Sequence, residues 1–172
     1  MTADDPDPPR RMGAVRPGST DRLRVADRLR VAVTDGRGRS RPAAGLSAWL
    51  SAAAPRSAVG EIVVALVGDR KMRDLNREFR AIDKVTDVLS FPADAVASGL
   101  SPAPTPFLGD VIIATGRAAR QARAAGLSES QEWRRLALHG LLHLLGHDHE
   151  QDDGQMERLE RRLRRRAGLP VD

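Results

Sequence analysis

The sequence of 172 residues predicts one α+β domain, in which a four-stranded mixed sheet packs with about five helices. A chain of this length has room for about one domain of ordinary size. Residues 61–67 (EIVVALV) are almost wholly apolar, as in a strand that is buried on both faces. Residues 128–145 are apolar nearly all round when placed on a helix, which is typical of a helix at the centre of a domain.

The domain is expected to span residues 28–170. Residues 1–27 mix Pro, Gly, Asp and Arg without apolar periodicity, so a disordered N-terminal extension is expected there. The first strand is expected from Leu29, because Leu29, Val31 and Val33 alternate with other residues as in a strand with one buried face.

Two helices are expected in the next part of the chain. The first covers residues 45–54, where Leu46, Trp49 and Leu50 share one face. The second follows the strand at residues 61–67 and is expected to have Asp69 as its N-cap, since a carboxylate there can accept a hydrogen bond from a free backbone N–H. Along it, apolar side chains recur at helical spacing: Met72, Leu75 and Phe79.

Two further strands are expected on either side of a loop. Residues 86–91 predict a strand that stops at Pro92, because proline has no N–H to continue the ladder. Residues 93–107 are rich in Pro, Ala and Ser and are expected to form a loop. The fourth strand is expected over residues 108–113.

The remaining helices have clear end signals. One is expected over residues 115–125, with Gly126 ending it in the left-handed conformation. Ser128 and Gln131 form the pattern of a capping box at the start of the central helix. A last helix carries apolar residues on one face and arginines on the other: Met156, Leu159 and Leu163 form the apolar face.

Composition limits the chemistry of the chain. There is no cysteine, so any transition metal must be held by histidine and carboxylate, and there are only four histidines. Neither a membrane-length apolar run nor a secretory signal is recognisable, so the cytoplasm is the expected compartment and no membrane partner is expected. The net charge of +5 is carried mainly by arginine, a good bidentate partner of phosphate, which favours an anionic polymer as partner.

Three histidines have the spacing of a metal site. His139 and His143 lie four residues apart on the predicted central helix, so both rings lie on one face. Gly146 allows the helix to stop and the chain to reverse, which can bring His149 back towards the first two. Three imidazoles and one open position are the arrangement of a catalytic zinc. We therefore expect one Zn²⁺ per chain, bound to the central helix.

The neighbours of these histidines leave some roles open. His147 is an alternative third ligand to His149, or a residue that hydrogen bonds to a ligand. Asp148, Glu150 and Asp110 are candidates to accept hydrogen bonds from the distal ring nitrogens and to fix their tautomers.

The spacing H-x-x-x-H-x-x-G-x-x-H also occurs in metzincin proteases, so a metallopeptidase is the alternative function. Those enzymes need a glutamate directly after the first histidine as the general base. Here Gly140 stands at that position, which disfavours the peptidase.

Three blocks together resemble the YbeY family of single-strand-specific, metal-dependent endoribonucleases. They are residues 139–149 (HGLLHLLGHDH), 75–92 (LNREFRAIDKVTDVLSFP) and 108–113 (LGDVII). The chain departs modestly: His147 stands where the family often has tyrosine, and Val85 and Asp87 stand where proline and asparagine are common.

The resemblance implies His149 rather than His147 as third ligand, and Arg80 as a catalytic residue in the cleft, where its guanidinium can pair with a phosphate. It implies zinc-assisted cleavage of single-stranded regions of ribosomal RNA precursors, 3′-end maturation of small-subunit rRNA, ribosome quality control, and contact with the small ribosomal subunit and its associated factors. A non-enzymatic ribosome-assembly factor with structural zinc remains a further alternative.

Other polar residues have weaker signals. Asn76, Asp83, Thr86 and Ser90 either line the cleft or cap and turn the chain, and a structural role is favoured for Asp83 and Thr86. The arginines of residues 161–166 either follow a phosphate backbone or form a solvated helix face. With three Phe, two Trp and no Tyr, the composition favours recognition of the RNA backbone over base stacking.

Overall fold

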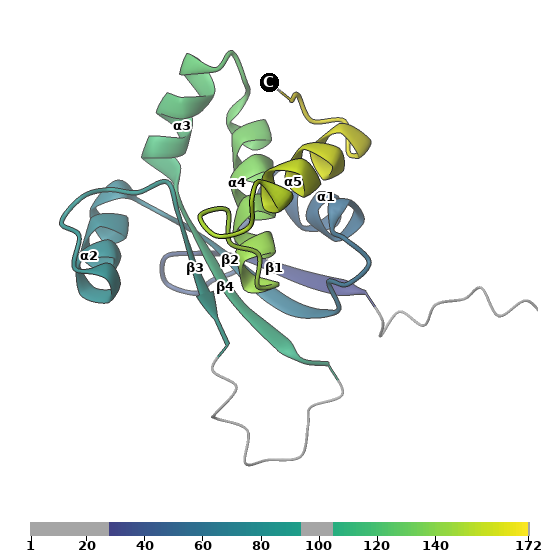
Figure 1. Ribbon diagram of the computed structural model, residues 1–172. Helices are drawn as coiled ribbons and strands as arrows, with labels where there is room; N and C mark the ends of the chain where they lie inside the picture. The colour runs from purple at the N-terminus through teal and green to yellow at the C-terminus, as the bar shows by residue number, and fades with distance from the viewer. Residues whose placement is uncertain (1–27, 94–104, 172) are drawn as a thin grey trace, which may run out of the picture.

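A computed structural model describes residues 28–93 and 105–171, so the expected N-terminal extension and most of the expected loop lie outside the described residues. Within them, four strands form one mixed sheet in the order β1-β2-β4-β3 (Figure 1). β1 (Leu29–Asp35), β2 (Gly60–Val67) and β4 (Phe107–Ala114) run parallel, and β3 (Val88–Pro92) pairs antiparallel with β4 at the edge.

Five helices surround this sheet in the described part of the chain, so the predicted fold class is confirmed. They are α1 (Leu46–Ala53), α2 (Asp69–Arg80), α3 (Thr115–Ala124), α4 (Glu129–Leu144) and α5 (Gln155–Arg166). Figure 1 shows α1, α4 and α5 together over one face of the sheet and α2 set apart beside β3. None of the helices in the described residues is long and apolar enough to cross a bilayer.

The two faces of the sheet have separate apolar cores. Leu66 and Ile113 belong to the core under α1, α4 and α5, whereas the next residues along their strands, Val67 and Ala114, pack with Met72 of α2. Successive strand residues point to opposite faces, so α2 covers the face opposite to α4.

Helix α4 is central, as predicted: it contacts α1, α3, α5, β3 and β4. Its first turn is fixed by the predicted capping box. The backbone N–H of Gln131 donates to Ser128 Oγ at 3.2 Å, and the N–H of Ser128 donates to Gln131 Oε1 at 2.9 Å. Local sequence chemistry therefore sets where the helix begins, and apolar contacts hold it against the sheet.

Two local predictions were wrong. Gly68, not Asp69, is the N-cap of α2, and the Asp69 carboxylate accepts hydrogen bonds from the Arg117 backbone and from Arg120 on α3, at 2.9 and 2.7 Å. Strand β3 begins at Val88 and includes Pro92 as its last residue. Because β3 is an edge strand, the missing N–H of proline is tolerated there.

Candidate metal centre and cleft

His139 and His143 share one face of α4. Their ring centroids lie 4.8 Å apart, and the two Nε2 atoms are separated by 3.1 Å. The four-residue spacing produces this geometry, since side chains at i and i+4 lie above one another on a helix. Two imidazole nitrogens this close require either a shared proton or a shared cation.

The turn directly after α4 places the third ring, that of His149, beside the first two. Gly146 has a φ of +89°, a conformation that glycine adopts without the steric penalty of a side chain. The backbone N–H of His147 then donates to the Leu142 carbonyl at 3.1 Å, which closes the turn. His149 consequently lies with its ring centroid 5.6 Å from that of His139 and 5.3 Å from that of His143.

The donor set fits a zinc ion. One potential ligand atom from each of His139, His143 and His149 lies within 4.8 Å of the others. A tetrahedral zinc with bonds of about 2.0–2.1 Å would place its nitrogens about 3.3 Å apart, close to the observed Nε2 pair. Cationic repulsion is limited because burial, and then the charges of His139 and His149, lower the pKa of His143.

Glu160 on α5 holds the distal side of the first ring. Its Oε2 lies 2.9 Å from His139 Nδ1, and its side chain is only 12% exposed. A carboxylate accepts but does not donate, so Nδ1 carries the proton and Nε2 keeps its lone pair for a cation. This residue was not predicted from the sequence.

Asp148, Glu150 and Asp110 were the candidates to accept a hydrogen bond from a histidine ring nitrogen. Among the described contacts, none of the three does so. Asp148 accepts a hydrogen bond from the backbone N–H of Glu150 at 3.0 Å, within the turn itself. Asp110 lies on β4, where burial raises its pKa. His147 lies outside the group of three rings and lines the adjacent cavity instead.

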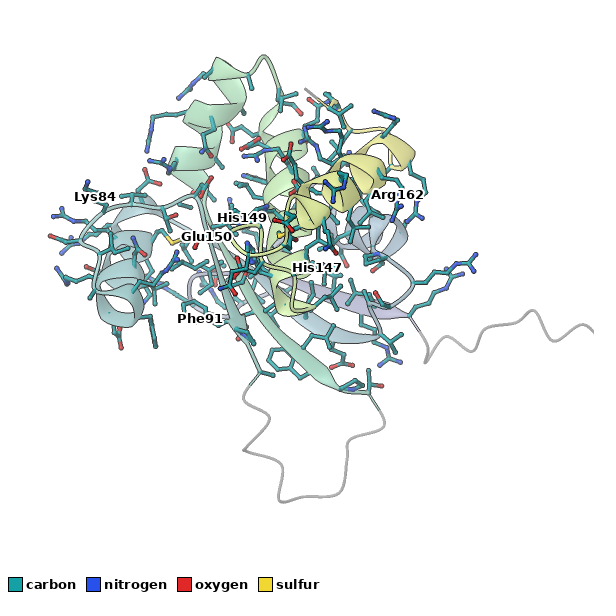
Figure 2. All side chains as sticks on the ribbon, viewed as in Figure 1. Lys84, Phe91, His147, His149, Glu150 and Arg162 are labelled. Carbon is teal, nitrogen blue, oxygen red and sulfur yellow. The ribbon has the colours of Figure 1, made fainter. Side chains whose placement is uncertain are left out.

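A cavity of about 800 Å³ opens beside the three rings, and Figure 2 shows His147, His149 and Glu150 on the turn that borders it. α2, β3 and the α4–α5 turn supply its walls. The lining residues are Phe79, Arg80, Thr86, Asp87, Val88, Leu89, Ser90, Phe91, Pro92, His139, His143, Gly146, His147, Asp148, His149 and Glu150.

Arg80 is the arginine of α2 that lines this cavity. Two other arginines on the same helix, Arg73 and Arg77, lie 2.8 and 3.8 Å from the carboxylate of Asp83. Within the described residues no carboxylate lies at ion-pair distance from Arg80. Its guanidinium is thus left available to an anion in the cavity.

Gly140 is required by packing between α4 and the sheet. A Cβ at this position would lie 2.6 Å from Val111 Cγ1 and 3.0 Å from Ser90 Oγ. Ser90 Oγ also donates a hydrogen bond to the Gly140 carbonyl at 3.1 Å. A glutamate, as metzincins need here, has no space in this arrangement.

The remaining polar candidates divide between the two roles. Asn76 is buried and donates a hydrogen bond to the Lys84 carbonyl at 2.8 Å, which is a structural role, whereas Thr86 lines the cavity.

Three arginines of residues 161–166 make contacts within the protein. Arg161 pairs with Glu157, Arg164 donates a hydrogen bond to the Pro170 carbonyl, and Arg166 donates one to the Ala53 carbonyl.

Comparison with known proteins agrees with the sequence blocks. A family model described as Endoribonuclease YbeY matches residues 43–168. Proteins named endoribonuclease YbeY from Solibacter usitatus and Koribacter versatilis are 50% and 44% identical to this chain, over 62% and 73% of its length. The matches cover 65% and 77% of those two relatives, and 38% of a relative from Myxococcus xanthus.

A solved structure from Thermotoga maritima aligns over 81% of this chain and 88% of its own, with 22% identity and a TM-score of 0.49. The family match spans most of the chain and includes all three clustered histidines and Arg80. This chain belongs to the YbeY endoribonuclease family.

Proposed function

We propose that this chain is an endoribonuclease that cleaves single-stranded RNA, with His139, His143 and His149 holding one zinc ion. The family membership supports the activity. The observation that carries the metal site is the convergence of three imidazoles within 4.8 Å at the wall of an open cavity. A closed structural site would not need the cavity, whereas a catalytic one needs an open position for substrate.

The residues of the cleft have complementary tasks in this reaction. A bound zinc ion would polarise a phosphoryl oxygen or lower the pKa of a bound water towards about 7. Arg80 pairs with the phosphodiester and offsets the charge that develops during cleavage. Glu160 keeps the lone pair of His139 Nε2 directed at the site.

The family resemblance extends the proposal to the cell. We infer that the substrates are single-stranded regions of ribosomal RNA precursors, including the 3′ end of small-subunit rRNA, and that the chain also takes part in ribosome quality control. The small ribosomal subunit and its associated factors are the proposed partners, in the cytoplasm. Residues 28–170 are proposed as the catalytic domain.

Two alternatives make different demands on the site. A metallopeptidase needs a general base next to His139, and the close contact of Gly140 with Val111 leaves no space for one. An assembly factor with structural zinc needs a fourth protein ligand, for which His147 is the nearest histidine in sequence. Coordination number therefore separates the structural site from the catalytic one.

The proposed function is tested by two substitutions in the zinc-loaded chain. His143→Ala should remove both the bound zinc, measured by mass spectrometry of the metal, and cleavage of a labelled single-stranded RNA. Arg80→Ala should keep the zinc and slow cleavage by about 100-fold or more, because it removes charge stabilisation only. Arg77→Ala is the matched control, since Arg77 is on the same helix but outside the cavity lining.

Cleavage products that are unchanged by His143→Ala would overturn the catalytic proposal. X-ray absorption showing four protein nitrogens around zinc, one of which is lost in His147→Ala, would support the structural alternative instead. Release of peptides from an unfolded protein, sensitive to a chelator, would support the peptidase.

A further inference from the structure

Two of the three phenylalanines of the chain line the metal cavity. Phe79 comes from the last turn of α2 and Phe91 from β3, and their rings pack edge to face with centroids 5.0 Å apart and an interplanar angle of 66°. Figure 2 shows Phe91 on the side of the histidine cluster that faces α2. The pair thus joins the separate helix α2 to the wall of the cleft.

Phe79 is unusually exposed for its type, at 58%. Met72, two helical turns earlier on α2, is fully buried against the sheet, so the helix does have an apolar face that is satisfied. Phe79 lies at the C-terminal end of this apolar face of α2, and its side chain lines the cavity. Exposure of a large aromatic ring carries a hydrophobic cost that a ligand can remove.

The chemistry around this ring identifies the ligand. Arg80 is the next residue and has no carboxylate at ion-pair distance among the described residues, and the three imidazoles form the cation site of the same cavity. Cationic groups suit a phosphodiester, and an exposed aromatic face beside them suits a base.

We propose that Phe79, supported from the side by Phe91, is a stacking site for the nucleobase next to the cleaved phosphodiester. This inference rests on the proposed function and names the part of the substrate that the cleft recognises. A base inside a duplex has both faces covered by its neighbours, so only an unpaired and unstacked base can lie on Phe79. The site therefore gives a physical reason for preference towards single strands.

The position of the aromatic rings leads to a different expectation from their number. A content of 3% aromatic residues favours recognition of the RNA backbone over base stacking. The structure places two of these few rings in the wall of the cavity that all three clustered histidines line. One well-placed ring is sufficient, because stacking acts on each base separately and tolerates any base sequence.

The test compares three variants in the full zinc-loaded chain. Phe79→Leu keeps an apolar side chain but removes the ring, and should weaken binding of a short single-stranded RNA by about 5- to 100-fold. Phe79→Tyr restores a ring and should recover most of this loss. Phe107→Leu is the matched control, because Phe107 is also exposed, at 45%, but lies outside the cavity lining.

A second readout places the base directly. 2-Aminopurine, introduced at successive positions of the RNA, should show quenched fluorescence at one position next to the cleavage site with the unsubstituted chain, and not with Phe79→Leu. An abasic nucleotide at that position should reduce binding by the unsubstituted chain and cause no further loss in Phe79→Leu.

Two failures are distinguishable. If the unsubstituted chain cleaves and binds RNA but Phe79→Leu and Phe107→Leu behave alike, the stacking site is wrong while the nuclease stands. If the unsubstituted chain neither binds nor cleaves RNA, the proposed function fails and the stacking site fails with it.

Discussion

At the scale of single residues, the site depends on which nitrogen of His139 carries the proton. The ring has Glu160 Oε2 at 2.9 Å on one side and His143 Nε2 at 3.1 Å on the other. The carboxylate selects the tautomer with Nδ1–H, which leaves the Nε2 lone pair free for the proposed zinc ion. We therefore propose that Glu160 is a positioning residue that acts through His139.

Replacement of this carboxylate should weaken metal binding without unfolding the chain. Glu160→Gln keeps an acceptor oxygen near Nδ1 but removes the negative charge, so zinc affinity should fall by about 10- to 100-fold. Competition with a chromophoric chelator measures the dissociation constant. Glu157→Gln is the control on the same helix, because Glu157 pairs with Arg161 at an exposed position. Equal zinc affinities in the two variants would refute the role of Glu160.

Sequence spacing predicts the three rings but not Glu160. His139, His143 and His149 are ten residues from first to last, and helix geometry and one glycine bring them together. Glu160 is 21 residues from His139, and their contact depends on how α5 folds back over α4. Nothing in local spacing distinguishes it from Glu157, the other acidic residue of α5. The candidates that the sequence analysis named were Asp148, Glu150 and Asp110, and none of them is the hydrogen-bond partner of His139 Nδ1.

At the scale of elements, the cleft depends on how closely α4 approaches β4 and β3. Gly140 makes this approach possible, and it stands between the two histidines of the helix. The same contact aligns Ser90 with the α4 backbone through its hydrogen bond. The helix that carries His139 and His143 is thus held against the sheet that supplies part of the cavity wall.

A methyl group at Gly140 should destabilise the fold even though alanine favours helices. The helix gains about 1 kcal/mol from Gly→Ala. Overpacking against Val111, 2.6 Å from the new Cβ, should cost about 1–3 kcal/mol, so the net effect is a loss of about 1 kcal/mol. Urea denaturation measures it. In a Val111→Ala background the same substitution should cost less, and a more stable Gly140→Ala chain would contradict close packing.

A second junction between elements involves a carboxylate. Asp87, just before β3, accepts hydrogen bonds from the Val88 backbone at 2.9 Å and from Gln121 of α3 at 3.0 Å. Burial raises the pKa of Asp87, but these hydrogen bonds and the charge of Arg117 outweigh it, so the pKa lies below its ordinary value.

This lowered pKa predicts a pH dependence of stability. Because the folded chain binds the proton of Asp87 more weakly than the unfolded chain, the carboxylate stabilises the fold above the ordinary pKa. That stability is lost as the pH falls through the lowered one. Asp87→Asn should reduce stability at neutral pH and make the acid limb of the stability profile less steep. Thermal unfolding at a series of pH values measures both, and an unchanged profile would contradict the assignment.

The individual helices and strands were more predictable from the sequence than the contacts between them. The run at residues 61–67, the capping box at Ser128 and the apolar central helix each carry their own local signal, and all are confirmed. Asp69 was mistaken for an N-cap because its real partners, Arg117 and Arg120, lie on another helix. Contacts between elements depend on packing that local propensity does not encode.

At the scale of the whole molecule, two apolar cores support the sheet without the metal. The larger core lies under α1, α4 and α5, and the smaller one under α2. The cavity opens where α2 on one side and the α4–α5 turn on the other leave β3 uncovered. The proposed zinc ion would connect α4 with this turn, so it adds to a fold that already has its own core.

Metal removal should therefore lower thermal stability and leave the fold intact. At a zinc concentration about 100 times its dissociation constant, binding contributes about 2.7 kcal/mol. For a domain of this size that corresponds to a rise in Tm of about 5–10 °C. Calorimetry with and without a chelator should show this difference, while the far-ultraviolet circular dichroism stays the same. His143→Ala should show no difference. Complete unfolding on chelation would mean that the metal builds the fold, and an unchanged Tm would mean that the three imidazoles hold no metal.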